Sequence, residues 1–171
     1  MAFSKIIAES MDLTDTFNFT GTITGAGESN NQYFRAKLSS NQAPANGTDV
    51  KIICNTEDYD VGGNYDNSTG RFVPPNGKIF LIYLQTAIGS DTARNLQEAR
   101  LQLWKNGSEI MQLRQDTWEN NSNRMSPCLS TIVTGNGSDY YELYVNVYVG
   151  SGNTKVFATN TYFQGFLLTS T

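Results

Sequence analysis

The stretch of residues 64–80, NYDNSTGRFVPPNGKIF, constrains the fold more than any other part of the chain. Gly70, Pro74 and Gly77 interrupt it at positions that call for a restricted or positive-φ backbone. Three aromatic residues lie between and beside these turns: Tyr65, Phe72 and Phe80. The stretch therefore predicts a turn, a short strand, a Pro-Pro break, an Asn-Gly turn and an apolar strand, which together form a pinned corner of a β-structure.

The composition fits one globular domain with few charges. Charged residues make up 16% of the 171 residues, against about 25% in an average protein. The net charge is −4 and the 12 Lys and Arg residues are scattered, which argues against nucleic acid as a partner. The chain has no apolar run of roughly 18 residues, and residues 1–10 lack the apolar core of a secretory signal. We expect a protein made in a cytoplasm, with no membrane insertion.

Residues 79–84, IFLIYL, are apolar at every position, so both faces of this strand should be covered. In a two-layer sandwich one face meets the core. The other face is then left for a partner.

Residues 140–149 show the clearest strand alternation. The odd positions are apolar and predict a core face: Tyr141, Leu143, Val145, Val147 and Val149. The even positions are polar and rich in tyrosine: Tyr140, Glu142, Tyr144, Asn146 and Tyr148. Tyrosine is enriched at protein interfaces, so this row predicts a contact surface, with an ordinary exposed face as the alternative.

A hairpin is predicted around Asn106-Gly107. Leu101 and Leu103 should share a face with Met111 and Leu113, and this parity predicts a three-residue loop, 105–107. Residues 86–97 look like a polar loop. In all, the pattern indicates about ten strands and no helix, as in an antiparallel sandwich.

The N-terminal 30 residues differ from the rest of the chain. Residues 21–31 are rich in Gly, Thr, Ser and Asn, which is typical of a linker. We therefore expect an attachment arm over residues 1–30 and one domain over residues 31–171. The apolar side chains of the arm are Phe3, Ile6, Ile7, Leu13, Phe17 and Phe19.

Little in the sequence points to catalysis, and we expect neither an enzyme nor a cofactor. The chain has no histidine, which removes Ser-His and Cys-His nucleophiles and His-based metal sites. Cys54 and Cys128 predict two buried free thiols, with a disulfide as the alternative. The densest acidic group is Glu57, Asp58, Asp60 and Asp66. It is interpreted as a solvated loop, with a Ca²⁺ site or a carboxylate pair for glycoside cleavage as alternatives.

Several spaced motifs resemble those of C1q-like domains. VGGNYDNSTGRFVPPNGKIF at 61–80 is similar to the hallmark of that family, and three further matches are FRA at 34–36, LWKNG at 103–107 and TYFQGFLL at 161–168. The resemblance covers residues 33–168. It implies a ten-stranded antiparallel jelly roll that assembles as a homotrimer. On this basis the predicted trimer interface comprises Phe80, Ile82, Tyr144, Tyr148 and Tyr162.

The first 27 residues, MAFSKIIAESMDLTDTFNFTGTITGAG, resemble the start of virion proteins from marine tailed phages. Together the two resemblances imply a non-enzymatic trimeric appendage, knob or decoration protein, located on a virion. Its arm would join capsid or tail proteins. The alternative is a receptor-binding fibre tip that recognises host surface glycans, and a third hypothesis is a carboxylate-dependent glycan depolymerase.

Overall fold

The computed structural model describes residues 31–92, 94–117 and 122–170. The predicted arm residues Phe3, Ile6, Ile7, Leu13, Phe17 and Phe19 lie outside the described residues, and so does the predicted domain boundary. The strands are β1 (Tyr33–Lys37), β2 (Asp49–Lys51), β3 (Thr56–Val61), β4 (Tyr65–Asp66), β5 (Arg71–Phe72), β6 (Lys78–Ser90), β7 (Leu96–Lys105), β8 (Ser108–Asp116), β9 (Arg124–Met125), β10 (Cys128–Thr134), β11 (Tyr141–Val149) and β12 (Thr154–Ser170).

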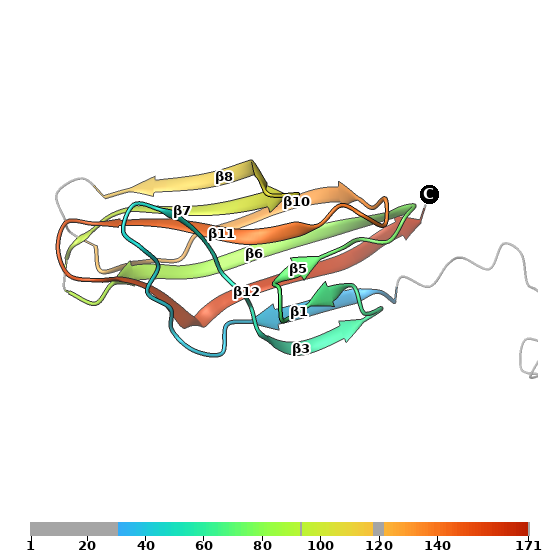
Figure 1. Ribbon diagram of the computed structural model, residues 1–171, viewed down its shortest axis with the longest axis horizontal. Coiled ribbons are helices and arrows are strands. Elements are labelled where there is room, and N and C mark those ends of the chain that lie inside the picture. Colours follow the sequence, from blue (N-terminus) through green and yellow to red (C-terminus); the bar gives the residue numbers. More distant parts are fainter. Residues whose placement is uncertain (1–30, 93, 118–121, 171) are drawn as a thin grey trace, which may run out of the picture.

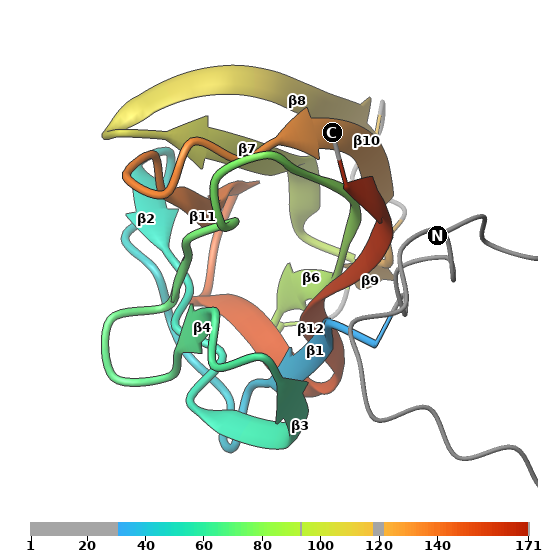
Figure 2. The ribbon, with the colours of Figure 1, turned by 90° about the vertical axis from the view of Figure 1, so that its right-hand side faces the viewer.

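The strands form two antiparallel sheets that pack face to face (Figures 1 and 2). The first sheet has the order β10-β6-β12-β1-β3, with β9 beside β6. The second sheet has the order β4-β5-β11-β7-β8, with β2 beside β11. This is the predicted all-β sandwich. In the described ranges no helix is long and apolar enough to cross a membrane.

The core lies between the sheets and follows the predicted alternation of β11. Tyr141, Leu143, Val145, Val147 and Val149 are all buried, which confirms the core face predicted for this strand. Their neighbours on β7 are the buried side chains of Ala99, Leu101 and Leu103.

The predicted corner adds Tyr65, Phe72 and Phe80 to a cluster of five packed aromatic rings in this core. Phe34 stacks on Tyr65 and on Phe72, with ring centroids 4.9 and 4.6 Å apart. Phe163 and Phe80 meet these rings edge-on. Gly70 and Gly77 have φ values of 71° and 68°, as the turn chemistry of the stretch predicts.

Two details differ from the prediction. Residues 86–90 belong to β6, where residues 87–90 pair with residues 154–157 of β12 and two of them pair with β9. Residues 96–97 belong to β7, so the predicted polar loop is confined to the stretch between Ser90 and Leu96. The β7–β8 hairpin has a two-residue Asn106-Gly107 turn with φ values of 51° and 79°. A β-bulge beside Leu103 and Trp104 shifts the register by one residue and so places Met111 opposite Leu103, on the same face.

Both ends of the described chain lie at the same end of the sandwich (Figure 1). Tyr33 at the start of β1 is the direct partner of Phe166 near the end of β12. The backbone N–H of Leu167 donates to the carbonyl of Gln32 across 2.9 Å.

Candidate functional site

The outward face of the first sheet carries an apolar row that crosses all five of its main strands. The backbone register places one residue of each strand directly beside the next: Ile132, Leu81, Phe166, Tyr33 and Val61. We call these five residues the apolar row. Direct cross-strand neighbours on one face of a sheet have Cβ atoms about 5 Å apart, so the row forms a continuous surface.

The row is exposed in the protomer. Ile132 is 62% exposed, and Phe166, Tyr33 and Val61 are 37–38% exposed. Two further large apolar side chains, Tyr59 and Leu168, are exposed on the same sheet. An exposed apolar surface of this kind marks an interaction site more often than a solvated face.

The same sheet face becomes polar farther from the chain ends. The amide oxygen of Gln85 accepts hydrogen bonds from the hydroxyls of Tyr83 and Tyr162, across 2.8 and 2.7 Å. The guanidinium of Arg35 lies over the Tyr162 ring, 4.7 Å from its centroid.

The outward face of the second sheet is covered by its own side chains. Glu142 is only 2% exposed and accepts hydrogen bonds from Lys51 and Arg71, across 3.1 and 3.0 Å. Trp104 stacks on Tyr144 with centroids 4.1 Å apart. This polar and aromatic layer shields the middle of the sheet, whereas Ile110 and Met111 on the edge strand β8 and Tyr148 on β11 are exposed.

The structure divides the five predicted interface residues among three places. Tyr162 faces outward on the first sheet, opposite Gln85, and its role as a contact residue stays a prediction. Phe80 and Ile82 are 1% and 0% exposed inside the protomer core, so their prediction as contact residues is wrong. Tyr144 and Tyr148 lie on the opposite sheet and cannot form one patch with Tyr162.

The outward positions of β6 are Ile79, Leu81 and Tyr83, which alternate with the buried Phe80, Ile82 and Leu84. Because residues 79–84 are apolar at every position, the sequence does not reveal which set faces out. The apolar row was therefore missed. Its clearest sequence signal is Ile132, whose outward neighbours on β10, Ser130 and Thr134, are polar. Ile132 is the most exposed of the large apolar side chains described.

The predicted acidic group is dispersed into separate structural roles. Asp58 pairs with Lys37 and, at 3.4 Å, with Arg35. The carboxylate of Asp60 accepts the backbone N–H groups of Asn64 and Tyr65. Asp66 accepts from the Ser68 and Thr69 hydroxyls, and these bonds lower its pKa to about 2.

The carboxylate of Asp66 is therefore ionised at neutral pH, whereas the general acid of a glycosidase needs a raised pKa. Among the described residues no three acidic or cysteine side chains gather as metal ligands would.

Both cysteines are free thiols, but only one is buried. Cys54 is fully buried, and this burial raises the pKa of its thiol to about 12. Cys128 is exposed, which corrects the expectation of a second buried thiol. Its strand position places it opposite Gln85, on the outward face of the first sheet.

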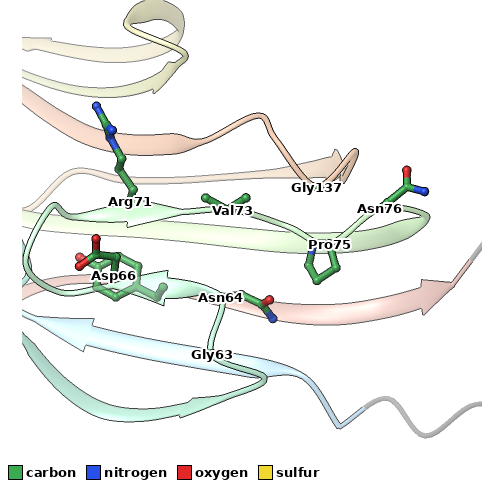
Figure 3. A pocket seen from close by; sticks show the side chains of 9 residues that line it. Gly63, Asn64, Asp66, Arg71, Val73, Pro75, Asn76 and Gly137 are labelled. Carbon is green, nitrogen blue, oxygen red and sulfur yellow. The ribbon is translucent and has the colours of Figure 1, made fainter.

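An open cavity of about 460 Å³ lies beside the corner (Figure 3). We call it the end pocket. It is lined by residues of the β4–β5 corner and of the two turns near it: Gly63, Asn64, Tyr65, Asp66, Arg71, Val73, Pro75, Asn76 and Gly137. The corner was predictable from the sequence but this cavity was not, because the pocket depends on how residues near 137 approach residues 74–76.

Comparisons with known proteins identify the fold. No family model matches the sequence, and no curated protein matches it. The globular domain of zebrafish complement 1qA protein superposes with a TM-score of 0.58 at 11% identity, over 82% of this chain and 99% of that one. Murine APRIL superposes with a TM-score of 0.60 at 8% identity, over 80% of this chain and 98% of that one. The fold is a C1q- and TNF-like jelly roll. The predicted fold class is thereby confirmed.

Proposed function

We propose that this protein is a non-enzymatic homotrimeric module whose subunits meet through the apolar row. The observation that carries the proposal is the contrast between the two outward sheet faces. The second sheet covers itself with the Glu142 ion pairs and the Trp104–Tyr144 stack, whereas the first sheet exposes a row of apolar side chains. Burying that row against another copy removes apolar area from water at about 25 cal/mol per Å².

A closed trimer needs two different surfaces on each subunit, since its contacts run head to tail. A second exposed apolar surface is present on the edge strand β8. Ile110 and Met111 of this strand are 50% and 38% exposed. The apolar row of one subunit and the β8 edge of the next are the pair of surfaces that we propose to meet.

The absence of histidine and the separate roles of the carboxylates support a non-enzymatic role. Asp58, Asp60 and Asp66 each hold local structure through hydrogen bonds or ion pairs. No pair of them is set apart in a cleft as acid and nucleophile.

The proposed location is a tailed-phage virion, where residues 1–30 join the module to capsid or tail proteins. This part of the proposal rests only on the resemblance of the first 27 residues to the start of phage virion proteins, because the comparisons with known proteins concern the fold. An arm departing next to Tyr33 would leave the sandwich at the end where β12 also finishes. Removing residues 1–30 should leave a folded trimer that no longer joins the particle.

The oligomeric state tests the module. Light scattering on the full chain should give three times the 18.9 kDa mass of one protomer. Ile132→Lys places a charge in the apolar row and should give folded monomers. Tyr148→Lys changes an exposed side chain on the opposite sheet and should remain trimeric. A monomeric wild-type protein, or dissociation caused by Tyr148→Lys instead, would refute the proposed interface.

A second candidate function is recognition of host surface glycans. The end pocket favours it, since an open cavity lined by amide and apolar groups suits a sugar better than it suits a packing role.

A further inference from the structure

We propose that the end pocket binds one residue of a neutral saccharide, with Asn64 and Asn76 as its hydrogen-bonding groups. This inference rests on the glycan-recognition alternative and assigns its site. It is independent of the virion location.

The pocket has the size and rigidity of a binding site. Its volume of about 460 Å³ lies within the range of about 300–1,000 Å³ that small-molecule sites occupy. Its walls are tied together by backbone hydrogen bonds, from Val73 N–H to the Asn64 carbonyl at 2.9 Å and from Gly137 N–H to the Pro74 carbonyl at 3.2 Å. Preformed walls reduce the ordering cost of binding.

The two charged side chains that line the pocket, Asp66 and Arg71, have opposite charges and each is bonded to other groups of the protein. Asp66 is held by Ser68 and Thr69. Arg71 bonds Glu142 at 3.0 Å and lies over the Tyr140 ring, 4.0 Å from its centroid. Figure 3 shows the Arg71 side chain directed away from Asp66. One carboxylate and one guanidinium leave no net charge to attract an ionic ligand, so a neutral ligand fits best.

Two carboxamides provide the open hydrogen-bonding capacity. The side chain of Asn76 is exposed and forms no hydrogen bond within the described part of the chain. The side chain of Asn64 makes a single long bond, from Nδ2 to Gln32 Oε1 at 3.5 Å. An amide can donate to one sugar hydroxyl and accept from another.

Val73 and Pro75 give the pocket an apolar surface, and Pro75 lies between the two amides in Figure 3. A pyranose presents hydroxyls around its edge and C–H groups on its faces, which matches this combination of linings. A phosphate has no apolar group to place against Val73 and Pro75.

The site also stays open in the proposed trimer. None of its lining residues belongs to β1, β3, β6, β10 or β12, the strands of the sheet that carries the apolar row. A trimer assembled through that sheet would therefore carry three copies of the pocket. Several weak sites on one particle raise the overall avidity for a multivalent ligand.

Titrations of the full-length protein with maltose, lactose, cellobiose and diacetylchitobiose at millimolar concentrations test the site. The expected result, followed by two-dimensional amide NMR, is a saturable shift of the amide resonances of residues 63–66, 71–73, 76 and 137 with at least one of the four sugars. Asn76→Ala should weaken that binding about fivefold, as expected for one lost hydrogen bond. Asn76→Asp, which suits the same turn, should weaken it as well, so a folding defect cannot account for both.

Gln115→Ala is the matched control, since it removes an exposed amide from the distant edge strand β8 and should leave affinity unchanged. If a sugar shifts the amide resonances of Trp104 and Tyr144 and not those of the pocket residues, the assigned site is wrong, although glycan recognition itself is retained. No response to any of the four sugars would overturn the site, and adhesion of the intact protein to host cells would then decide glycan recognition separately. Deletion of residues 1–30 could instead shift the amide resonances of the pocket residues while no sugar shifts them. That result would identify the arm as the occupant of the end pocket and also refute the proposal.

Discussion

The hydroxyl of Tyr65 donates a hydrogen bond to the backbone carbonyl of Cys54 across 3.0 Å, inside the aromatic end of the core. Tyr65 is 6% exposed, and its ring packs against Phe34 and Phe163. The bond links the β4 corner to the segment that leads into β3.

Tyr65→Phe should lower the free energy of unfolding by about 1 kcal/mol, since it removes this bond and leaves the Cys54 carbonyl buried without it. The ring packing is kept, so the fold should persist. Urea denaturation measures the difference. Tyr148→Phe, at a 47% exposed position, should change nothing, and an equal effect of both variants would contradict the role of the bond.

Gly135 lies where the chain packs against the backbone of Pro74 and Pro75, beside the end pocket. A Cβ atom there would lie 2.0 Å from the carbonyl oxygen of Pro75 and 2.6 Å from that of Pro74, and both are backbone atoms. Gly135→Ala should therefore cost at least about 3 kcal/mol, or prevent folding. Thermal unfolding by circular dichroism measures it.

Gly63→Ala is the comparison, because a Cβ atom at Gly63 meets nothing within 4 Å. It should cost only about 1 kcal/mol, the strain of its φ value of +65°. A larger loss at Gly63 than at Gly135 would contradict the close approach.

The two thiols should react differently. Cys54 is buried with its pKa raised to about 12, so it stays protonated and inaccessible at mildly alkaline pH. Cys128 is exposed. In the Ile132→Lys background, where subunit contacts are removed, a thiol-reactive dye should label one cysteine in the folded chain and two in denaturant. Rapid labelling of both in the folded chain would show that Cys54 is not enclosed as described.

Asp66 gives a pH-dependent prediction. Hydrogen bonds from Ser68 and Thr69 lower its pKa from 3.8 to about 2 in the folded protein. Its contribution to stability is therefore complete above pH 3.8 and is lost as the pH falls toward 2. Asp66→Asn should be less stable than the wild type at neutral pH, and the two should converge near pH 2.

Denaturation curves across this pH range measure the convergence. Glu57→Gln serves as the control, because Glu57 is exposed on β3 and its carboxylate makes no hydrogen bond in the described ranges. A difference between Asp66→Asn and wild type that stays constant with pH would argue against the hydrogen-bonded carboxylate.

The fold was predictable where the sequence alternates or where turn residues fix the backbone. The alternation of β11 set its core face, and the glycines and prolines of residues 64–80 set the corner. An outward apolar face on residues 79–84 was expected, but the residues that form it were not predictable, since β6 is apolar at every position from Ile79 to Leu84 and local sequence does not say which set points outward.

Two further misses have local causes. The segment TAIGS at 86–90 looks like a loop, yet the strand continues because β9 and β12 cover it, and a Cβ atom at Gly89 would lie 2.3 Å from the Asn123 carbonyl oxygen. Leu101 and Leu103 do share a face with Met111 and Leu113, as predicted, but the predicted three-residue loop is wrong. It would have placed Leu101 opposite Met111, whereas a β-bulge places Leu103 there. The end pocket was missed because its wall around Gly137 comes from a turn distant in sequence.

The apolar row is assembled from five strands that lie far apart along the chain, at positions 33, 61, 81, 132 and 166. No short segment of a nascent or unfolded chain contains this surface, so it arises only when all five strands have paired in register. Incompletely folded subunits would lack this surface and could not associate through it. Assembly would therefore be restricted to subunits that have completed folding.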